Sequence, residues 1–245
     1  MNIVMRGELR CKLRRSFIGI SGLVVLLFFA SPVYGFDFSI SHKEAGIELM
    51  PEYNRSYSSC LTLSASGSLE FNELYTVQGG LSLWTASAAY ELDASAGLEA
   101  RLIRRVPLYM YLSYMFNTLP EYEANSHTVL PLIGFKGKYA GFTLGPNLRF
   151  SSFFDDPVIF ESILAFEGYV NFYNSEKFRI GLRCANFNDY AAGNFGVYYL
   201  SLNSRVGITK SLSLTNALEL HQTGSAGLSS RFYGIAYKAG LVFTW

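Results

Sequence analysis

Apolar and polar residues alternate with a period of two along most of the chain after residue 35. In residues 60–71 (CLTLSASGSLEF), every second residue from Leu61 onward is apolar or glycine, and the residues between them are polar. Residues 90–103 and 142–151 repeat this pattern. Successive side chains of a β-strand point to opposite faces, so each of these segments predicts a strand with one apolar and one polar face.

The same alternation predicts twelve strands in all. They cover about residues 44–53, 59–71, 74–84, 88–103, 107–117, 127–138, 140–152, 158–173, 177–188, 194–208, 211–222 and 231–245. Residues 36–41 also alternate, and they either extend the first strand or form a short separate one. No apolar run in this region approaches the roughly 20 residues of a membrane-spanning helix.

The connections between the predicted strands are short and longer in turn. Those after the second, fourth, sixth, eighth and tenth strands hold only one to three residues, whereas the longer ones cover 118–126, 152–157, 189–193 and 223–230. Tight turns at one end and longer loops at the other are typical of barrels that cross a membrane. The sequence therefore predicts an all-β fold, a closed antiparallel transmembrane β-barrel of about 12 strands, with about 10 or about 14 as alternatives.

Aromatic residues gather near both ends of these strands on the apolar face. They are Phe71, Tyr75, Phe142, Phe172, Phe178, Phe243 and Trp245 near the short turns, and Tyr53, Tyr90, Phe116, Phe150, Phe160, Tyr198 and Tyr233 near the longer loops. Such rings favour the boundary between lipid headgroups and hydrocarbon. A soluble periplasmic β-protein would show the same alternation, but two aromatic girdles favour the membrane barrel.

The last predicted strand includes residues 233–245 (YGIAYKAGLVFTW), in which apolar residues alternate back from a terminal tryptophan. It resembles the last strand of bacterial outer-membrane β-barrel proteins, as does the pattern of the whole chain. The resemblance implies a porin-like protein of no particular subfamily, in contact with the lipid bilayer of the bacterial cell outer membrane in a Gram-negative-type envelope. It also implies that the barrel-insertion machinery reads a signal made of Tyr237, Leu241, Phe243 and Trp245.

Residues 1–35 are predicted to be a cleaved secretory signal peptide. A basic stretch precedes an apolar core at residues 17–30, and the segment ends on Gly35, as cleavage sites end on small residues. The core is short for a spanning helix, although a retained N-terminal anchor is the alternative. The transmembrane barrel is then expected to cover residues 36–245.

Removal of this segment changes the charge balance. It holds five of the 20 basic and one of the 19 acidic residues, which leaves 15 basic and 18 acidic residues and a net charge of −3. This balance gives no support for a nucleic acid partner. Cys60 and Cys184 remain, and we expect two isolated strand cysteines, with a single disulfide bridge as the alternative.

Three prolines, Pro51, Pro131 and Pro146, fall inside predicted strands. Proline has no amide hydrogen, so each one removes a hydrogen bond from a closed ladder. Each therefore predicts a bulge or a strand end that lies elsewhere.

The polar faces carry many charges, which a barrel would turn toward its lumen. The expected lumen-lining acids are Glu48, Glu70, Glu91, Asp93, Glu99, Glu161, Glu167 and Glu219, and the expected bases are Arg101, Lys136, Lys138, Arg149, Arg179, Arg183, Arg205 and Lys238. The first four strands supply five of these acids and one base, whereas the sixth, seventh, ninth and tenth supply only bases. This predicts walls of opposite charge and a transverse field on passing solutes. The alternative is that these groups pair across the lumen.

These features predict a passive diffusion channel for small hydrophilic solutes. One alternative is a closed barrel that serves as a surface adhesin or antigen through the loops at 118–126 and 223–230. Another is a membrane-embedded hydrolase whose candidate residues near the loops are Glu121, Glu123, His127, Asp155, Asp156 and His221. No spacing typical of a catalytic or metal-binding family accompanies them, so we expect no catalytic residue, no metal site and no cofactor.

Overall fold

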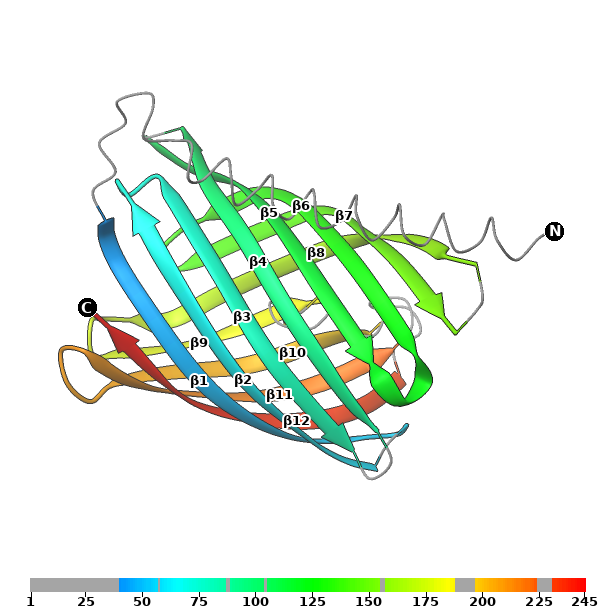
Figure 1. Cartoon of the computed structure of the whole chain (residues 1–245). Coiled ribbons are helices and arrows are strands. Elements are labelled where there is room, and N and C mark those ends of the chain that lie inside the picture. Colours follow the sequence, from blue (N-terminus) through cyan, green and yellow to red (C-terminus); the bar gives the residue numbers. More distant parts are fainter. Residues whose placement is uncertain are drawn as a thin grey trace. The chain divides into compact units, whose positions relative to one another are not determined.

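The computed structural model describes residues 40–56, 58–86, 89–103, 105–154, 157–187, 197–223 and 231–245. In these residues, twelve antiparallel strands form one closed barrel (Figure 1). The predicted signal peptide, Asp155, Asp156, the loop at 189–193 and residues 224–230 of the loop at 223–230 lie outside the described residues.

The strands follow one another around the barrel in chain order, and β1 pairs with β12 to close it. Closure gives every strand two neighbours, which a membrane requires because unpaired backbone groups are costly in hydrocarbon. The strands are β1 (Ile40–Asn54), β2 (Ser58–Phe71), β3 (Tyr75–Ala86), β4 (Tyr90–Ile103), β5 (Val106–Leu119), β6 (Ala124–Lys136), β7 (Ala140–Phe153), β8 (Ile159–Asn174), β9 (Phe178–Ala185), β10 (Val197–Gly207), β11 (Leu212–Thr223) and β12 (Arg231–Thr244).

The predicted fold class is confirmed. Each predicted segment corresponds to one strand, and no strand end differs from its predicted position by more than four residues. Of the alternating residues at 36–41, Ile40 and Ser41 belong to β1, and residues 36–39 lie outside the described residues.

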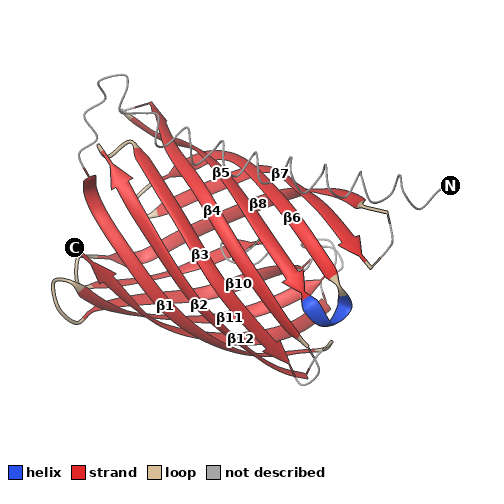
Figure 2. Cartoon of the chain, in the orientation of Figure 1, coloured by secondary structure: helices blue, strands red, loops and turns tan. Residues whose placement is uncertain are grey.

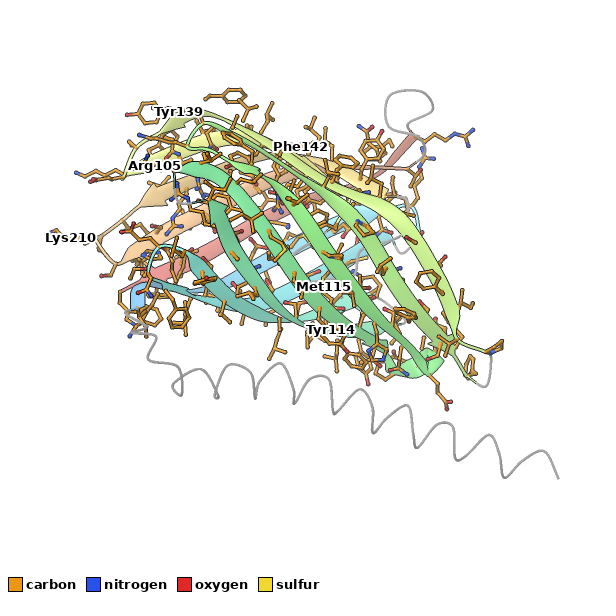
Figure 3. The ribbon with its side chains drawn as sticks, turned by 90° about the horizontal axis from the view of Figure 1, so that it is seen from above. Arg105, Tyr114, Met115, Tyr139, Phe142 and Lys210 are labelled. Atoms are coloured by element: carbon orange, nitrogen blue, oxygen red, sulfur yellow. The ribbon has the colours of Figure 1, made fainter. Side chains whose placement is uncertain are left out.

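The two ends of the barrel differ in their connections. We call the end that holds the turns β2–β3, β4–β5, β6–β7, β8–β9 and β10–β11 the turn end, and the opposite end the loop end. Arg105, Tyr139 and Lys210 lie in three of these turns, and Figure 3 shows them at one end of the molecule. Ile40 and Trp245 lie at this end too.

The loop predicted at residues 118–126 is shorter than expected. β5 continues to Leu119, β6 begins at Ala124, and one 3-10 turn, η2 (Pro120–Tyr122), joins them (blue in Figure 2). Ser126 is polar, but it is a buried strand residue rather than part of a loop. No helix in the described ranges is long and apolar enough to span a membrane.

The outer face of the barrel is apolar. Leu81 on β3 and Leu164 and Phe172 on β8 are each at least 60% exposed, which is the reverse of a water-soluble protein. Aromatic side chains from both predicted girdles are among the exposed residues, including Tyr53 and Phe160 at the loop end. This surface matches the apolar band flanked by aromatic girdles of a membrane barrel.

Tyr233 departs from the predicted alternation. A bulge between His221 and Gln222 shifts the β11–β12 pairing. Phe232 is therefore exposed, while Tyr233 lines a cavity inside the barrel.

The prolines interrupt two of the strand ladders without shifting their register. Between β6 and β7 the pairing runs from Val129↔Leu148 to Ile133↔Leu144, and the same register places Pro131 opposite Pro146 in the gap. The β1–β12 pairing skips Pro51 in the same way. The prediction of a bulge or a strand end at each proline is therefore wrong. A missing amide donor on one rung does not shift the register of the rungs beside it.

Candidate functional site

The lumen contains open space rather than a packed core. One cavity of about 610 Å³ lies toward the turn end and a second of about 390 Å³ toward the loop end. A third, of about 210 Å³, lies beside β1 to β5. Side chains can just fill a barrel of about eight strands, whereas this one is wider. We call the first two the turn-end cavity and the loop-end cavity.

The turn-end cavity is basic. Six Lys or Arg residues and three Glu residues line it, a net formal charge of +3. The cations are Lys136, Lys138, Arg179, Arg183, Arg205 and Lys238. Three of them lie on the adjacent strands β9 and β10, and a fourth lies on β6. The positive charge is therefore concentrated on one side of this cavity.

The loop-end cavity is acidic. Five Asp or Glu residues line it against Arg149 and Lys238, a net formal charge of −3 with His221 neutral. Asp93 is only 4% exposed and accepts hydrogen bonds from Ser82 Oγ at 2.7 Å and Asn117 Nδ2 at 2.6 Å. The carboxylate is thereby fixed in the wall of the cavity.

Phe187 lies where the two cavities meet. Both cavities share four lining residues, which are Phe187, Glu48, Glu219 and Lys238. The Phe187 side chain is 3% exposed and belongs to an apolar cluster with Tyr111, Met115, Leu130, Leu132 and Ala165. This cluster narrows the lumen from the β5, β6 and β8 side.

The end of β9 explains how Phe187 reaches this position. β9 stops at Ala185, which pairs with Glu167, so the first eight residues of β8, Ile159–Phe166, have no β9 rung beside them. The Asn186 side chain bonds two backbone groups in this part of β8. Its Oδ1 accepts a hydrogen bond from Phe166 N at 2.8 Å, and its Nδ2 donates one to Leu164 O at 2.7 Å. The chain then places Phe187 inside the barrel, where Tyr199 donates to its carbonyl.

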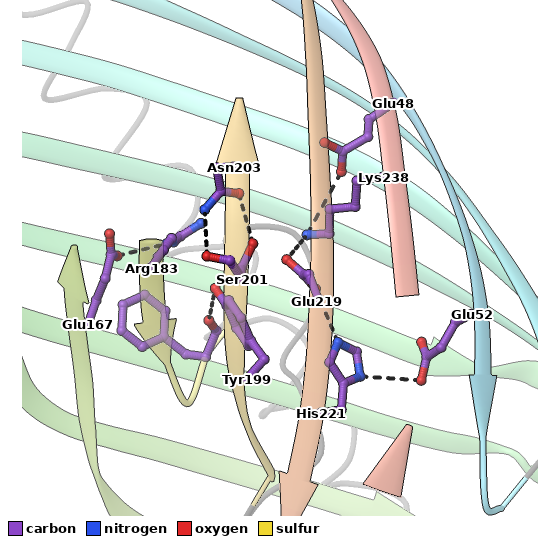
Figure 4. A network of polar contacts seen from close by, with 11 residues as sticks. Glu48, Glu52, Glu167, Arg183, Tyr199, Ser201, Asn203, Glu219, His221 and Lys238 are labelled. Atoms are coloured by element: carbon purple, nitrogen blue, oxygen red, sulfur yellow. Dashed lines mark hydrogen bonds and ion pairs between the residues drawn. The ribbon is translucent and has the colours of Figure 1, made fainter. Parts of the chain in front are cut away.

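A charged network lies at the same level (Figure 4). Lys238 Nζ is 3.1 Å from Glu219 and 3.9 Å from Glu48. His221 extends the chain of contacts, with Nε2 3.1 Å from Glu219 and Nδ1 3.4 Å from Glu52. The network joins β1, β11 and β12, so the narrow level of the lumen has an apolar side and a charged side.

Twelve of the sixteen predicted lumen residues line one of the two larger cavities. Glu70, Glu99, Arg101 and Glu161 do not. Glu70 accepts a hydrogen bond from Ser41 Oγ at 3.3 Å, and the Arg101 guanidinium lies 5.9 Å from the centre of the Tyr109 ring.

Glu161 and Lys138 lie near the two ends of the barrel. Glu161 is exposed and stands directly opposite Arg149 in the β7–β8 pair. Lys138 lies in the β6–β7 turn rather than on a strand, but it still lines the turn-end cavity.

Several of the predicted lumen charges form ion pairs with other strands of the wall. Lys136 on β6 pairs with Glu99 on β4. Arg205 on β10 reaches Glu44 on β1 at 3.1 Å, and Arg183 pairs with Glu167 on β8 at 3.1 Å. The first two contacts link acids on β4 and β1 with bases on β6 and β10, and the net charge also differs between the two larger cavities.

The sequence analysis did not anticipate the apolar cluster or the contribution of Glu52 and Glu44. A signal for the cluster was present, because residues 129–133 (VLPLI) are apolar on both faces of a strand. No local pattern marks Phe187, whose position depends on contacts with other strands.

The histidines make structural contacts. His127 Nδ1 is 2.7 Å from the Tyr114 hydroxyl, and its ring packs against Phe116. Both ring nitrogens of His221 contact carboxylates, as described above. Across the described ranges, no group of three or more His, Cys, Asp or Glu residues is placed to hold a metal ion. Cys60 and Cys184 are free thiols.

No family model and no curated protein sequence matches this chain. Solved structures do match. The NanC porin aligns with a TM-score of 0.53 at 9% identity, over 80% of this chain and 98% of NanC. The translocator domain of the autotransporter NalP from Neisseria meningitidis aligns with a TM-score of 0.52 at 11% identity, over 94% of this chain and 97% of that domain. The fold is that of bacterial outer-membrane β-barrels, as the resemblance implied.

Proposed function

We propose that this protein is a channel for the passive diffusion of small hydrophilic solutes across the bacterial outer membrane. The observation that carries the proposal is the unfilled lumen, whose two larger cavities adjoin at the level of Phe187 and Lys238. Charged groups in a water-filled bore, with an apolar outer surface, are what a diffusion channel needs.

The proposed membrane location follows from the outer surface. The terminal strand β12 presents Tyr237 and Phe243 outward, at 47% and 45% exposure, and Trp245, directly after it, is 64% exposed. Leu241 shares a rung with Ile47, which is also exposed. We propose that these residues guide insertion by the barrel-insertion machinery, with the turn end in the periplasm. Deletion of Trp245 should lower the amount of folded barrel in outer-membrane fractions, and unchanged levels would refute this part.

Planar-bilayer recording tests the channel itself. The purified protein should give stepwise conductance in potassium chloride, and liposomes that contain it should swell in small sugars but not in large ones. A barrel that gives no current at any voltage, although it is folded and inserted, would refute the proposal.

The structure offers less support for the alternatives. The adhesin alternative relied partly on a loop at 118–126, and that connection is a single 3-10 turn. For the hydrolase alternative, His221 is held by two glutamates inside the lumen. We therefore propose no enzymatic activity.

A further inference from the structure

Two arginines face each other inside the turn-end cavity. Arg179 on β9 and Arg205 on β10 are direct partners in the antiparallel pair, and both line the cavity. Like charges directly opposite in a sheet are destabilising. A fold can hold such a pair when an anion lies against both guanidinium groups.

Glu44 forms an ion pair with only one of the two, Arg205. Arg205 Nη1 lies 3.1 Å and 3.4 Å from the two carboxylate oxygens of Glu44. Arg179 forms no ion pair with any carboxylate in the residues that the structure describes, and its side chain is exposed to the cavity. A guanidinium presents planar donors that suit carboxylate and phosphate oxygens, so Arg179 is placed to bind an oxyanion.

The β6–β7 turn brings a further cation to this place. Asn174 is the register partner of Arg179, and its Nδ2 donates to the Lys138 carbonyl at 2.8 Å. Asn171 Nδ2 donates to the same carbonyl at 2.9 Å, and the Tyr169 hydroxyl donates to the Gly137 carbonyl at 2.7 Å. These three hydrogen bonds hold the turn beside Arg179, so Lys138 adds its charge at the mouth of the cavity.

We propose that the turn-end cavity binds small multivalent oxyanions, such as polycarboxylates and phosphate, through Arg179, Arg205 and Lys138. As a statement about the solutes of the channel, this rests on the proposed function. The cavity's net charge of +3 and its volume of about 610 Å³ suit a ligand of this class. The opposite charge of the loop-end cavity disfavours the same ligand there.

Isothermal titration calorimetry tests the proposal. The protein would be purified from membranes of cells that express the full chain, kept in non-ionic detergent at low salt, and titrated with citrate, then with inorganic phosphate, and with glucose as an uncharged comparison. We expect saturable citrate binding that weakens as salt is added. Arg179→Gln should weaken it about tenfold or more, as expected for the loss of a charge-assisted contact.

Two further variants keep the test decisive. Arg105→Gln removes an exposed arginine of the β4–β5 turn, at the same end but outside the cavity lining, and should leave binding unchanged. Arg205→Lys keeps the charge beside Glu44 and should retain more binding than Arg205→Gln. An absence of saturable binding, equal binding of glucose, or equal losses in Arg105→Gln and Arg179→Gln would overturn the proposal.

Calorimetry also separates this inference from the channel function. Citrate binding without conductance would leave the site standing and refute the channel. Conductance without citrate binding would leave the channel standing and refute the site.

Discussion

The Tyr199 hydroxyl donates a hydrogen bond of 3.1 Å to the backbone carbonyl of Phe187. Tyr199 lies on β10, so this contact anchors the residues that follow β9 onto β10, inside the lumen. Tyr199 is itself 7% exposed, and the guanidinium of Arg183 lies 5.8 Å from the centre of its ring. The narrow level of the bore is therefore set by packed and hydrogen-bonded groups rather than by a single projecting side chain.

Phe187→Ala should widen the bore. The variant removes the ring that both cavities share, so single-channel conductance should rise, while the free energy of unfolding should fall by about 3 kcal/mol through lost packing. Phe172→Ala, on the outer face at 60% exposure, should leave conductance unchanged. Equal conductance in the wild type and Phe187→Ala would show that the bore is not narrowest at this level.

Reversal of charge should change ion selectivity. Arg149 lines the loop-end cavity and Arg183 the turn-end cavity. Replacement of both by Glu makes both cavities more negative, so the reversal potential in a potassium chloride gradient should move toward the potassium equilibrium potential. An unchanged reversal potential would mean that these two arginines do not act on passing ions.

Lys238→Met should destabilise the barrel. Lys238 lies between Glu219 and Glu48, and Glu219 is only 3% exposed. Removal of the cation leaves the buried Glu219 carboxylate with one partner fewer. The free energy of unfolding should therefore fall by about 2 kcal/mol. Urea unfolding in detergent micelles measures the loss. The double variant Lys238→Met/Glu219→Gln should recover part of it, and Lys210→Met in an exposed turn should change little.

Gly145→Ala should destabilise the barrel. A Cβ atom at this position would lie 2.0 Å from the Pro131 carbonyl oxygen, which is backbone and cannot move away easily. The expected loss in the free energy of unfolding exceeds about 2 kcal/mol. Gly67→Ala is the control, because its nearest neighbour would be the Glu44 carbonyl oxygen at 3.6 Å, an ordinary contact. Equal urea midpoints for the two variants would contradict the close approach of β6 and β7.

The strands could be predicted from the sequence because a barrel in a membrane imposes alternation on every strand. Most inward charges followed from the same rule. The ion pair between Glu44 and Arg205 could not be predicted. These two residues lie 161 positions apart in sequence, and only the closed barrel brings β1 and β10 together. Phe187 could not be placed either, because Asn186 bonds to β8 through side-chain contacts that leave no periodic signal.

The prolines affect how the whole cylinder deforms. Pro131 and Pro146 interrupt the β6–β7 ladder, and Pro51 interrupts the β1–β12 ladder. In a ring of twelve strands these two seams are diametrically opposed. Missing amide donors make both seams more compliant than a fully hydrogen-bonded ladder. We expect the cross-section to flatten more readily about these two lines than about fully hydrogen-bonded ladders.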